Sequence, residues 1–178
     1  PVPAQEQGKS LVLSVRSGLS YDTNLFGAAA KNVESSVFQI APKAAYNASL
    51  TDQTFLALSY QLTLDHFDNR PGDKTLDSHE VSARVAHAFS AATNLDVLEV
   101  FQASRNPESL LSGAPINSDQ SNNRNEVNVT FFTAPTAKTG LTFKARAANT
   151  GFRAAVLSRR LDRTENLFGV SGSYAVLP

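Results

Sequence analysis

Hydrophobic and polar residues alternate along most of the chain. In the segment 11–21, one face carries Leu11, Leu13, Val15, Leu19 and Tyr21, and small or charged side chains occupy the other face. The alternation stops at the turn-forming residues 22–24. A period of two predicts a β-strand with one apolar face.

Seven further segments repeat this pattern. They cover residues 37–50, 54–67, 78–89, 95–104, 125–133, 141–149 and 168–176. In 95–104 the apolar positions shift by one residue after Val97, which predicts a β-bulge there and places Asp96 and Glu99 on the same polar face. No segment has the period of a long amphipathic helix.

Short and long connections alternate strictly between the predicted strands. The short ones are 51–53, 90–94 and 134–139, and the long ones are 22–36, 68–77, 105–124 and 150–166. This rhythm is typical of an outer-membrane barrel with short periplasmic turns and long extracellular loops. The fold class predicted is therefore all-β, an antiparallel up-and-down transmembrane β-barrel with about eight strands in residues 1–178 as a single domain.

Two other folds share the alternation. A soluble secreted β-sandwich or ligand-binding barrel also has one apolar and one polar face. A small closed outer-membrane barrel with a structural or adhesive role would contain the same eight strands. The membrane is favoured because the segments reach about 10 to 14 residues, whereas soluble strands are commonly about 5 to 6 and membrane strands need about 9 to 11.

The amino-acid composition excludes several classes of function and partner. Lys and Arg number 16, as do Asp and Glu, so the net charge is zero and no nucleic-acid partner is expected. Without cysteine the chain has no disulfide, thiolate ligand or thiol nucleophile. No catalytic or phosphate-binding motif stands out, so we expect no enzyme activity and no cofactor. The opening residues resemble a processed mature N-terminus, and 1–9 is predicted to be a short periplasmic segment.

The polar faces of the predicted strands carry most of the charged residues. In a pore these side chains would set the local field for solutes, and in a small closed barrel they would pair with one another and fill the interior. The candidates for lumen-facing positions are Arg16, Lys43, Asp65, Glu80, Arg84, Asp96, Glu126, Lys144 and Arg146.

Two connections hold clusters of candidate binding residues. The loop 150–166 contains Arg153, Arg159, Arg160 and Arg163, which could form a basic constriction, bind lipopolysaccharide phosphates or keep the loop solvated. His66 and His79 flank an acidic connection and could approach each other. The oxygen-bearing side chains of this connection are Asp65, Asp68, Asn69, Asp73 and Asp77. Their spacing lacks the glycine and final glutamate of a calcium loop, so we predict no metal site.

The sequence GLSYDTNLF, from Gly18 to Phe26, resembles the first hairpin of the β-barrel porin type 2 group, and the similarity extends over residues 18–46. The resemblance implies a Gram-negative outer-membrane protein, either a porin-like channel or a pore associated with exopolysaccharide export. Its partners would be outer-membrane lipid and lipopolysaccharide, with small solutes or polysaccharide in transit. Oligomer formation stays open. Tyr21 would lie at the outer membrane interface.

Barrels of that group are usually much longer than 178 residues, and outer-membrane barrels usually end in a strand with a terminal aromatic residue. This chain stops at Ala175-Val176-Leu177-Pro178, which is typical of the start of a periplasmic turn. We therefore expect the eight strands to belong to a larger barrel whose C-terminal part is missing from this chain.

Overall fold

The computed structural model describes residues 10–25, 33–105 and 119–176, so the predicted periplasmic segment 1–9 lies outside the described residues. The described part contains eight strands and one short helix. They are β1 (Leu11–Asp22), β2 (Ser35–Thr51), β3 (Thr54–Phe67), β4 (Thr75–Ser90), β5 (Thr93–Ser104), β6 (Asn122–Thr136), β7 (Thr139–Phe152), α1 (Ala155–Leu161) and β8 (Arg163–Tyr174).

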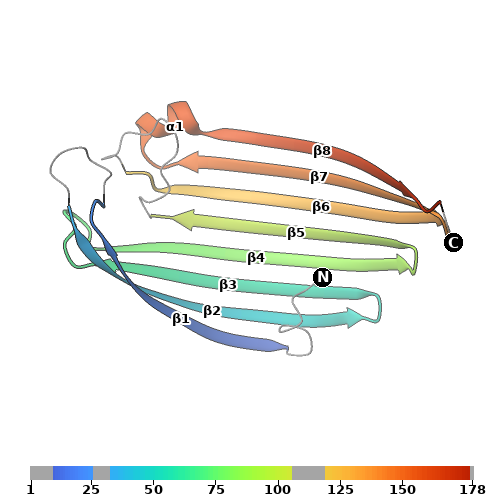
Figure 1. Cartoon of the computed structure of the whole chain (residues 1–178), viewed down its shortest axis with the longest axis horizontal. Helices are drawn as coiled ribbons and strands as arrows, with labels where there is room; N and C mark the ends of the chain where they lie inside the picture. Colours follow the sequence, from blue (N-terminus) through green and yellow to red (C-terminus); the bar gives the residue numbers. More distant parts are fainter. Residues whose placement is uncertain (1–9, 26–32, 106–118, 177–178) are drawn as a thin grey trace.

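The strands form one antiparallel up-and-down sheet in the order of the sequence (Figure 1). The short turns 52–53, 91–92 and 137–138 lie at one end, and the long connections and α1 lie at the other end (Figure 1). The predicted strand order and turn rhythm are therefore confirmed. In the described part β1 pairs only with β2, and β8 only with β7, so the sheet is open and does not close into an eight-stranded barrel.

The two faces of the sheet differ in chemistry. Cross-strand register places one set of side chains on an apolar face, represented strand by strand by Leu13, Phe38, Tyr60, Val81, Phe101, Val129, Phe143 and Val170. The opposite set forms a polar face, represented by Arg16, Lys43, Gln61, Glu80, Gln102, Arg124, Lys144 and Glu165.

Burial is inverted relative to a sheet packed on an ordinary core. On the apolar face large side chains are exposed, up to 78% for Leu19 and 80% for Phe168. The buried strand residues all lie on the polar face: Ser35, Val37, Ala41, Ala45, Asn47, Asp65, Phe67, Leu76, Ala148, Thr150 and Phe152. Side chains converge on the concave side of a curved sheet, so the polar face is the concave one.

The hydrophobic stretches of the apolar face form a continuous belt across all eight strands. We define the apolar belt by the runs 11–19, 38–50, 56–64, 81–89, 95–101, 127–131, 141–147 and 168–174. Aromatic residues lie at its edges and also within it. Toward the long connections they are Tyr21, Phe38, Phe101 and Phe168, toward the short turns they are Phe89, Phe131 and Tyr174, and within the runs they are Tyr46, Tyr60 and Phe143.

The apolar belt crosses the strands obliquely. Ala44, the centre of the run on β2, shares a register row with Asn149 on β7. The centre of the β7 run is Lys144, five residues from Asn149, so the belt shifts by five residues over five strand-to-strand steps. With a rise of about 3.3 Å per residue and a strand spacing of about 4.8 Å, this shift corresponds to strands tilted by about 35° from the belt's normal.

The predicted β-bulge near Val97 is wrong. The pairing of β5 with β4 is continuous from Ser104 to Asn94 and shifts only at the hairpin end. Glu99 therefore lies on the apolar face, where its Oε1 accepts a hydrogen bond of 3.1 Å from Asn125 Nδ2. Leu98, and not the carboxylate, faces the polar side. Because leucine and valine occur on both faces of β5, the alternation of hydrophobic residues looked as if it shifted by one position.

A small hydrophobic core lies at the end of the sheet with the long connections. Leu25, Val37, Phe67 and Leu76 are buried together, and Val33 packs against them. The backbone N–H of Leu25 donates to the carbonyl of Val33 at 2.9 Å, which fixes the two described ends of the β1–β2 connection.

Tyr21 lies at the same end of the sheet, on the apolar face. Its hydroxyl donates to Glu34 Oε2 at 2.5 Å, while the side chain is 62% exposed. The glutamate partner was not foreseen from the sequence, and the position of this ring at a membrane interface stays a prediction.

Helix α1 fills part of a connection that was predicted to lack regular structure. Leu157 is its buried residue, and the helix contacts β7. Asp162 tethers it, because Oδ2 accepts from the Ser158 hydroxyl at 2.6 Å and Oδ1 accepts from the Phe152 N–H at 2.7 Å. In the described part of the chain, no helix is long and apolar enough to cross a membrane.

Replacing Asp162 with alanine should release α1 from β7 and increase trypsin cleavage after Arg159 and Arg160. Asp52→Ala, in a short turn at the other end, is the matched control and should leave cleavage unchanged.

The hydrogen bond from the Ser158 hydroxyl, followed by that from the Phe152 N–H, holds the pKa of Asp162 below its ordinary value of 3.8. The tether is thus fully present above pH 3.8 and is lost as the pH falls through the lowered pKa. Equal cleavage in both variants would contradict this role.

Candidate functional site

The polar face brings together the charged residues singled out from the sequence. All nine candidates lie on this one face of the sheet: Arg16, Lys43, Asp65, Glu80, Arg84, Asp96, Glu126, Lys144 and Arg146. Their shared face follows from the period of two, because residues separated by an even number in a regular strand point the same way.

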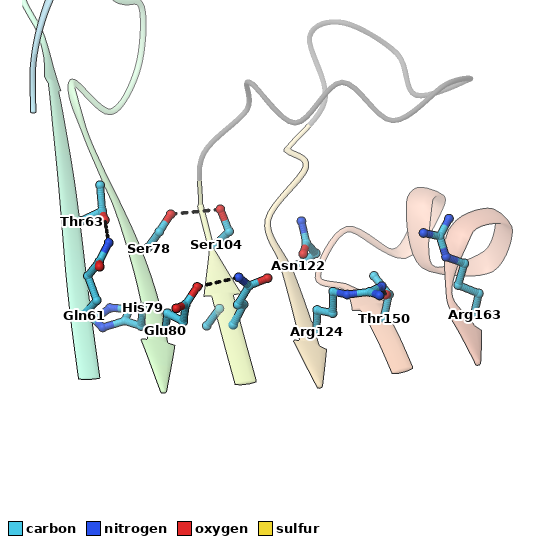
Figure 2. A pocket seen from close by; sticks show the side chains of 12 residues that line it. Gln61, Thr63, Ser78, His79, Glu80, Ser104, Asn122, Arg124, Thr150 and Arg163 are labelled. Carbon is cyan, nitrogen blue, oxygen red and sulfur yellow. Dashed lines mark hydrogen bonds between the residues drawn. The ribbon is translucent and has the colours of Figure 1, made fainter. Parts of the chain in front are cut away.

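One register row of the polar face runs across the entire sheet. It takes one residue from each strand in turn, and every member is polar: Ser14, Lys43, Gln61, Glu80, Gln102, Arg124, Thr150 and Arg163. The part of this row from β3 to β8 lines a hollow of about 360 Å³, together with Thr63, Ser78, Ser104 and Asn122 (Figure 2).

Neutral side chains dominate this hollow, and several hydrogen-bond one another across the strands. Gln102 Nε2 donates to Glu80 Oε2 at 2.8 Å, and the hydroxyls of Ser78 and Ser104 are 3.0 Å apart (Figure 2). The surface thus offers amide, hydroxyl, carboxylate and guanidinium groups to water or to a hydrophilic solute. Among the residues that line the hollow, the only aromatic side chain is the imidazole of His79, which stacks on Tyr60.

The densest ionic network of the described residues surrounds Glu126. Its Oε2 accepts from Arg124 at 2.7 Å and from Arg146 at 2.8 Å, and its Oε1 accepts from Asn128 at 3.0 Å. Arg146 also lies 3.5 Å from Glu165, which pairs with Arg163 at 2.7 Å. Two carboxylates are therefore shared among three guanidinium groups on β6, β7 and β8.

A second ion pair joins β4 to β5. Arg84 donates to both carboxylate oxygens of Asp96, and the side chains are 23% and 30% exposed. This bidentate geometry fixes both side chains against the wall. On β2 and β3, Asp65 is buried and accepts from Gln39 Nε2 at 2.8 Å.

Sequence reasoning missed part of this network. Arg124 was assigned to a connection because the strand was predicted to begin at Asn125, and Glu165 was assigned to the loop 150–166. Both belong to strands, since β6 begins at Asn122 and β8 at Arg163. The charges of alternating sign around Glu126 could have indicated that the strand begins before Asn125.

The predicted basic loop cluster is divided by the structure. Arg163 lies in β8 on the polar face, Arg159 and Arg160 form the last turn of α1, and Arg153 lies in the link between β7 and α1. All four are exposed. The connection between β7 and β8 is therefore shorter than the predicted loop 150–166, and all four arginines lie at its end of the sheet.

His66 and His79 do not approach each other. His66 Nδ1 is 2.9 Å from the Thr75 hydroxyl, whereas His79 stacks on Tyr60 and lies 3.1 Å from Asp77. In the acidic connection, Arg105 bridges Asp73 and Asp77 at 3.0 and 3.1 Å. The described residues contain no group of three or more potential metal ligands.

Family models, curated proteins and solved structures provide no match to this chain.

Glu126→Gln should lower the free energy of unfolding by about 1 to 3 kcal/mol, because two guanidinium groups lose their charged acceptor. Glu80→Gln is the matched control, since Glu80 accepts one hydrogen bond from a neutral amide and should cost less. Denaturant unfolding in lipid vesicles, followed by circular dichroism, measures both. An equal loss in the two variants would show that the network adds nothing beyond a single bond.

Proposed function

We propose that this chain forms part of the wall of a transmembrane β-barrel channel in a Gram-negative outer membrane. The observation that carries the proposal is the inverted burial of the sheet, with exposed leucine, valine and aromatic side chains on one face of every strand except β6, and a concave polar face. Exposed apolar surface of this extent needs an apolar environment. A hydrocarbon layer outside and water inside satisfy both faces at once.

The slope of the apolar belt supports a membrane as that environment. Strands of outer-membrane barrels are tilted by about 35 to 45°, and the belt of this sheet gives about 35° from its register. Tilted strands that cross a flat slab of lipid need hydrophobic runs that are displaced along the sheet, and the runs of β4 to β8 are displaced toward the short turns relative to those of β1 to β3. Those aromatic residues that lie at the two edges have the positions of the interfacial girdles of such barrels.

The open edges of β1 and β8 imply a barrel of more than eight strands. Each unpaired backbone group costs several kcal/mol in hydrocarbon, so a sheet in the membrane must close. These two strands have 12 residues each, and each pairs on one side only. We infer that additional strands pair with both edges, and a barrel well above eight strands leaves an aqueous lumen.

In this proposal the chain has a transport role and no catalytic one. The short turns face the periplasm, the long connections and α1 face outward, and β1 starts and β8 ends on the periplasmic side. The resemblance of residues 18–46 to the β-barrel porin type 2 group supports the same localisation. It also supports lipid and lipopolysaccharide as surroundings, and hydrophilic solutes or polysaccharide as cargo.

Leu58 and Ser59 are neighbours on opposite faces and provide a matched test of the membrane assignment. Leu58→Arg should destabilise the protein in lipid by about 2 to 4 kcal/mol, because it places a charge near the centre of the apolar belt. Ser59→Arg projects into the lumen and should be tolerated. Folding into phospholipid vesicles, followed by protection from protease, measures both, and equal tolerance would remove the membrane assignment.

Channel activity can be tested separately in liposomes. The closed barrel, refolded with the strands that pair with β1 and β8, should make liposomes swell in isotonic solutions of small neutral solutes, with rates that fall as solute size increases. Protein-free liposomes and liposomes carrying the Leu58→Arg variant are the controls. A protein that resists protease in the bilayer without causing swelling would exclude a channel and favour a structural or adhesive role for its loops.

A further inference from the structure

A second hollow lies on the face of the sheet that carries the apolar belt, opposite the hollow of Figure 2. We call it the outer hollow; its volume is about 370 Å³, and it lies toward the long connections. Asn123 and Asn125 on β6 and Asn149 and Gly151 on β7 line it, and Phe101 lies beside them on β5. Its size is at the lower end of the range of about 300 to 1,000 Å³ for small-molecule sites.

The register places the outer hollow just beyond the apolar belt. Phe101 is the last residue of the run 95–101. Asn125 and Asn149 lie two residues beyond the runs on their strands, and Asn123 and Gly151 lie four residues beyond. With a rise of about 3.3 Å per residue and a tilt of about 35°, these positions are about 5 and 11 Å past the edge of the belt. The polar layer of a bilayer is about 5 to 8 Å thick on each side, so the hollow lies at the level of the lipid head groups.

Hydrogen bonds to neighbouring strands orient two of the asparagines. Asn149 Nδ2 donates to the Thr164 hydroxyl at 3.1 Å, and Asn125 Nδ2 donates to Glu99 Oε1 at 3.1 Å. A primary amide has two N–H donors and an oxygen acceptor, so one such bond orients the group and leaves it able to bind a ligand. A Cβ placed on Gly151 would meet nothing within 4 Å, so this part of the hollow is open.

This lining suits a sugar better than an ion. Arg153 lines the hollow and Glu99 contacts one of its amides, so charges of both signs border it. Amides can donate to and accept from the hydroxyls around a pyranose ring. The ring of Phe101, which is 40% exposed, can pack against the apolar C–H face of the same sugar. Because Phe101 also ends the run on β5, acyl chains attached to that sugar would lie along the apolar belt.

We propose that the outer hollow binds the sugar head group of a glycolipid in the outer leaflet. The inference rests on the proposed function, because the hollow meets lipid head groups only if the sheet spans the outer membrane. A glycolipid fits better than a sugar in solution, since the hollow opens on the lipid-facing side and continues into the belt. One molecule then satisfies both surfaces, with its hydroxyls on the asparagines and its hydrocarbon on the belt.

Native mass spectrometry of the closed barrel, released from dodecylphosphocholine micelles, counts the lipids that stay bound. The probe is digalactosyl diacylglycerol, a neutral glycolipid, and phosphatidylcholine with the same acyl chains is the reference. The wild type should retain the glycolipid several-fold more than the reference. Gly151→Leu should abolish this difference, because leucine fills the hollow. Gly169→Leu is the matched control, at a glycine of equal clearance on the polar face, and should preserve the difference.

Asn123→Ala removes one amide from the hollow and should reduce the retention of the glycolipid several-fold. Asn166→Ala is its matched control, because Asn166 lies on the same face of the sheet, two residues beyond the run on β8, and outside the hollow. This variant should retain the glycolipid as the wild type does.

Equal retention of the two lipids, or wild-type retention by Gly151→Leu, would overturn this inference. Binding of methyl galactoside as tight as that of the glycolipid would overturn the lipid as the source of the sugar. These results leave the channel itself intact. Protein that fails to insert into vesicles would instead overturn the proposed function, and the glycolipid site with it.

Discussion

A sheet of a single layer can bury only one face by its own curvature, and this sheet buries the polar one. No second sheet or long helix packs on it within the described residues. On the concave side, small residues such as Ala41, Ala45 and Ala148 leave space for longer side chains to meet across the strands. The apolar side chains are left outside, so the surroundings of the protein have to supply what a core supplies elsewhere. The slope of the apolar belt, the open edges of the sheet and the positions of the charged residues are all interpreted from this need for an apolar environment outside the sheet.

The period of two was sufficient to predict the eight strands, their order and the alternation of turns, because most strands are apolar on one face over at least five consecutive positions. It failed at the strand ends. Residues 122–124 and 163–166 are polar on both faces, so they resemble loops although backbone pairing continues through them. It also failed in β5, where Leu98 and Val100 occupy the polar face and Glu99 the apolar one. Helix α1 spans only seven residues, too few to establish a helical period.

The common face of the nine charged candidates could be predicted, but their partners could not. Arg84 meets Asp96 because the β4–β5 hairpin sets a register that places the two residues diagonally on adjacent strands. Glu126 contacts Arg124 on its own strand and Arg146 on the next one. Such diagonal contacts depend on the register of each hairpin, which the length of a turn fixes and hydrophobic alternation does not. Sheet closure is likewise invisible to alternation, since it depends on strands that pair with β1 and β8.

Strand length explains why polar residues also occur on the apolar face. β2 has 17 residues and β4 has 16, whereas a tilted strand crosses hydrocarbon with about 9 to 11. Because the belt slopes, the excess lies on the long-connection side from β4 to β8, and the apolar face there carries Asp77, His79, Asn123, Asn125, Asn149 and Asn166. Glu99 lies within the run 95–101 of the apolar belt, where its carboxylate accepts a hydrogen bond from the Asn125 amide. Beyond the belt, β4 to β8 extend toward the long connections by three to six residues each. In the proposed membrane arrangement these polar ends would project above the hydrocarbon layer, which is where polar residues on an outward face can meet water.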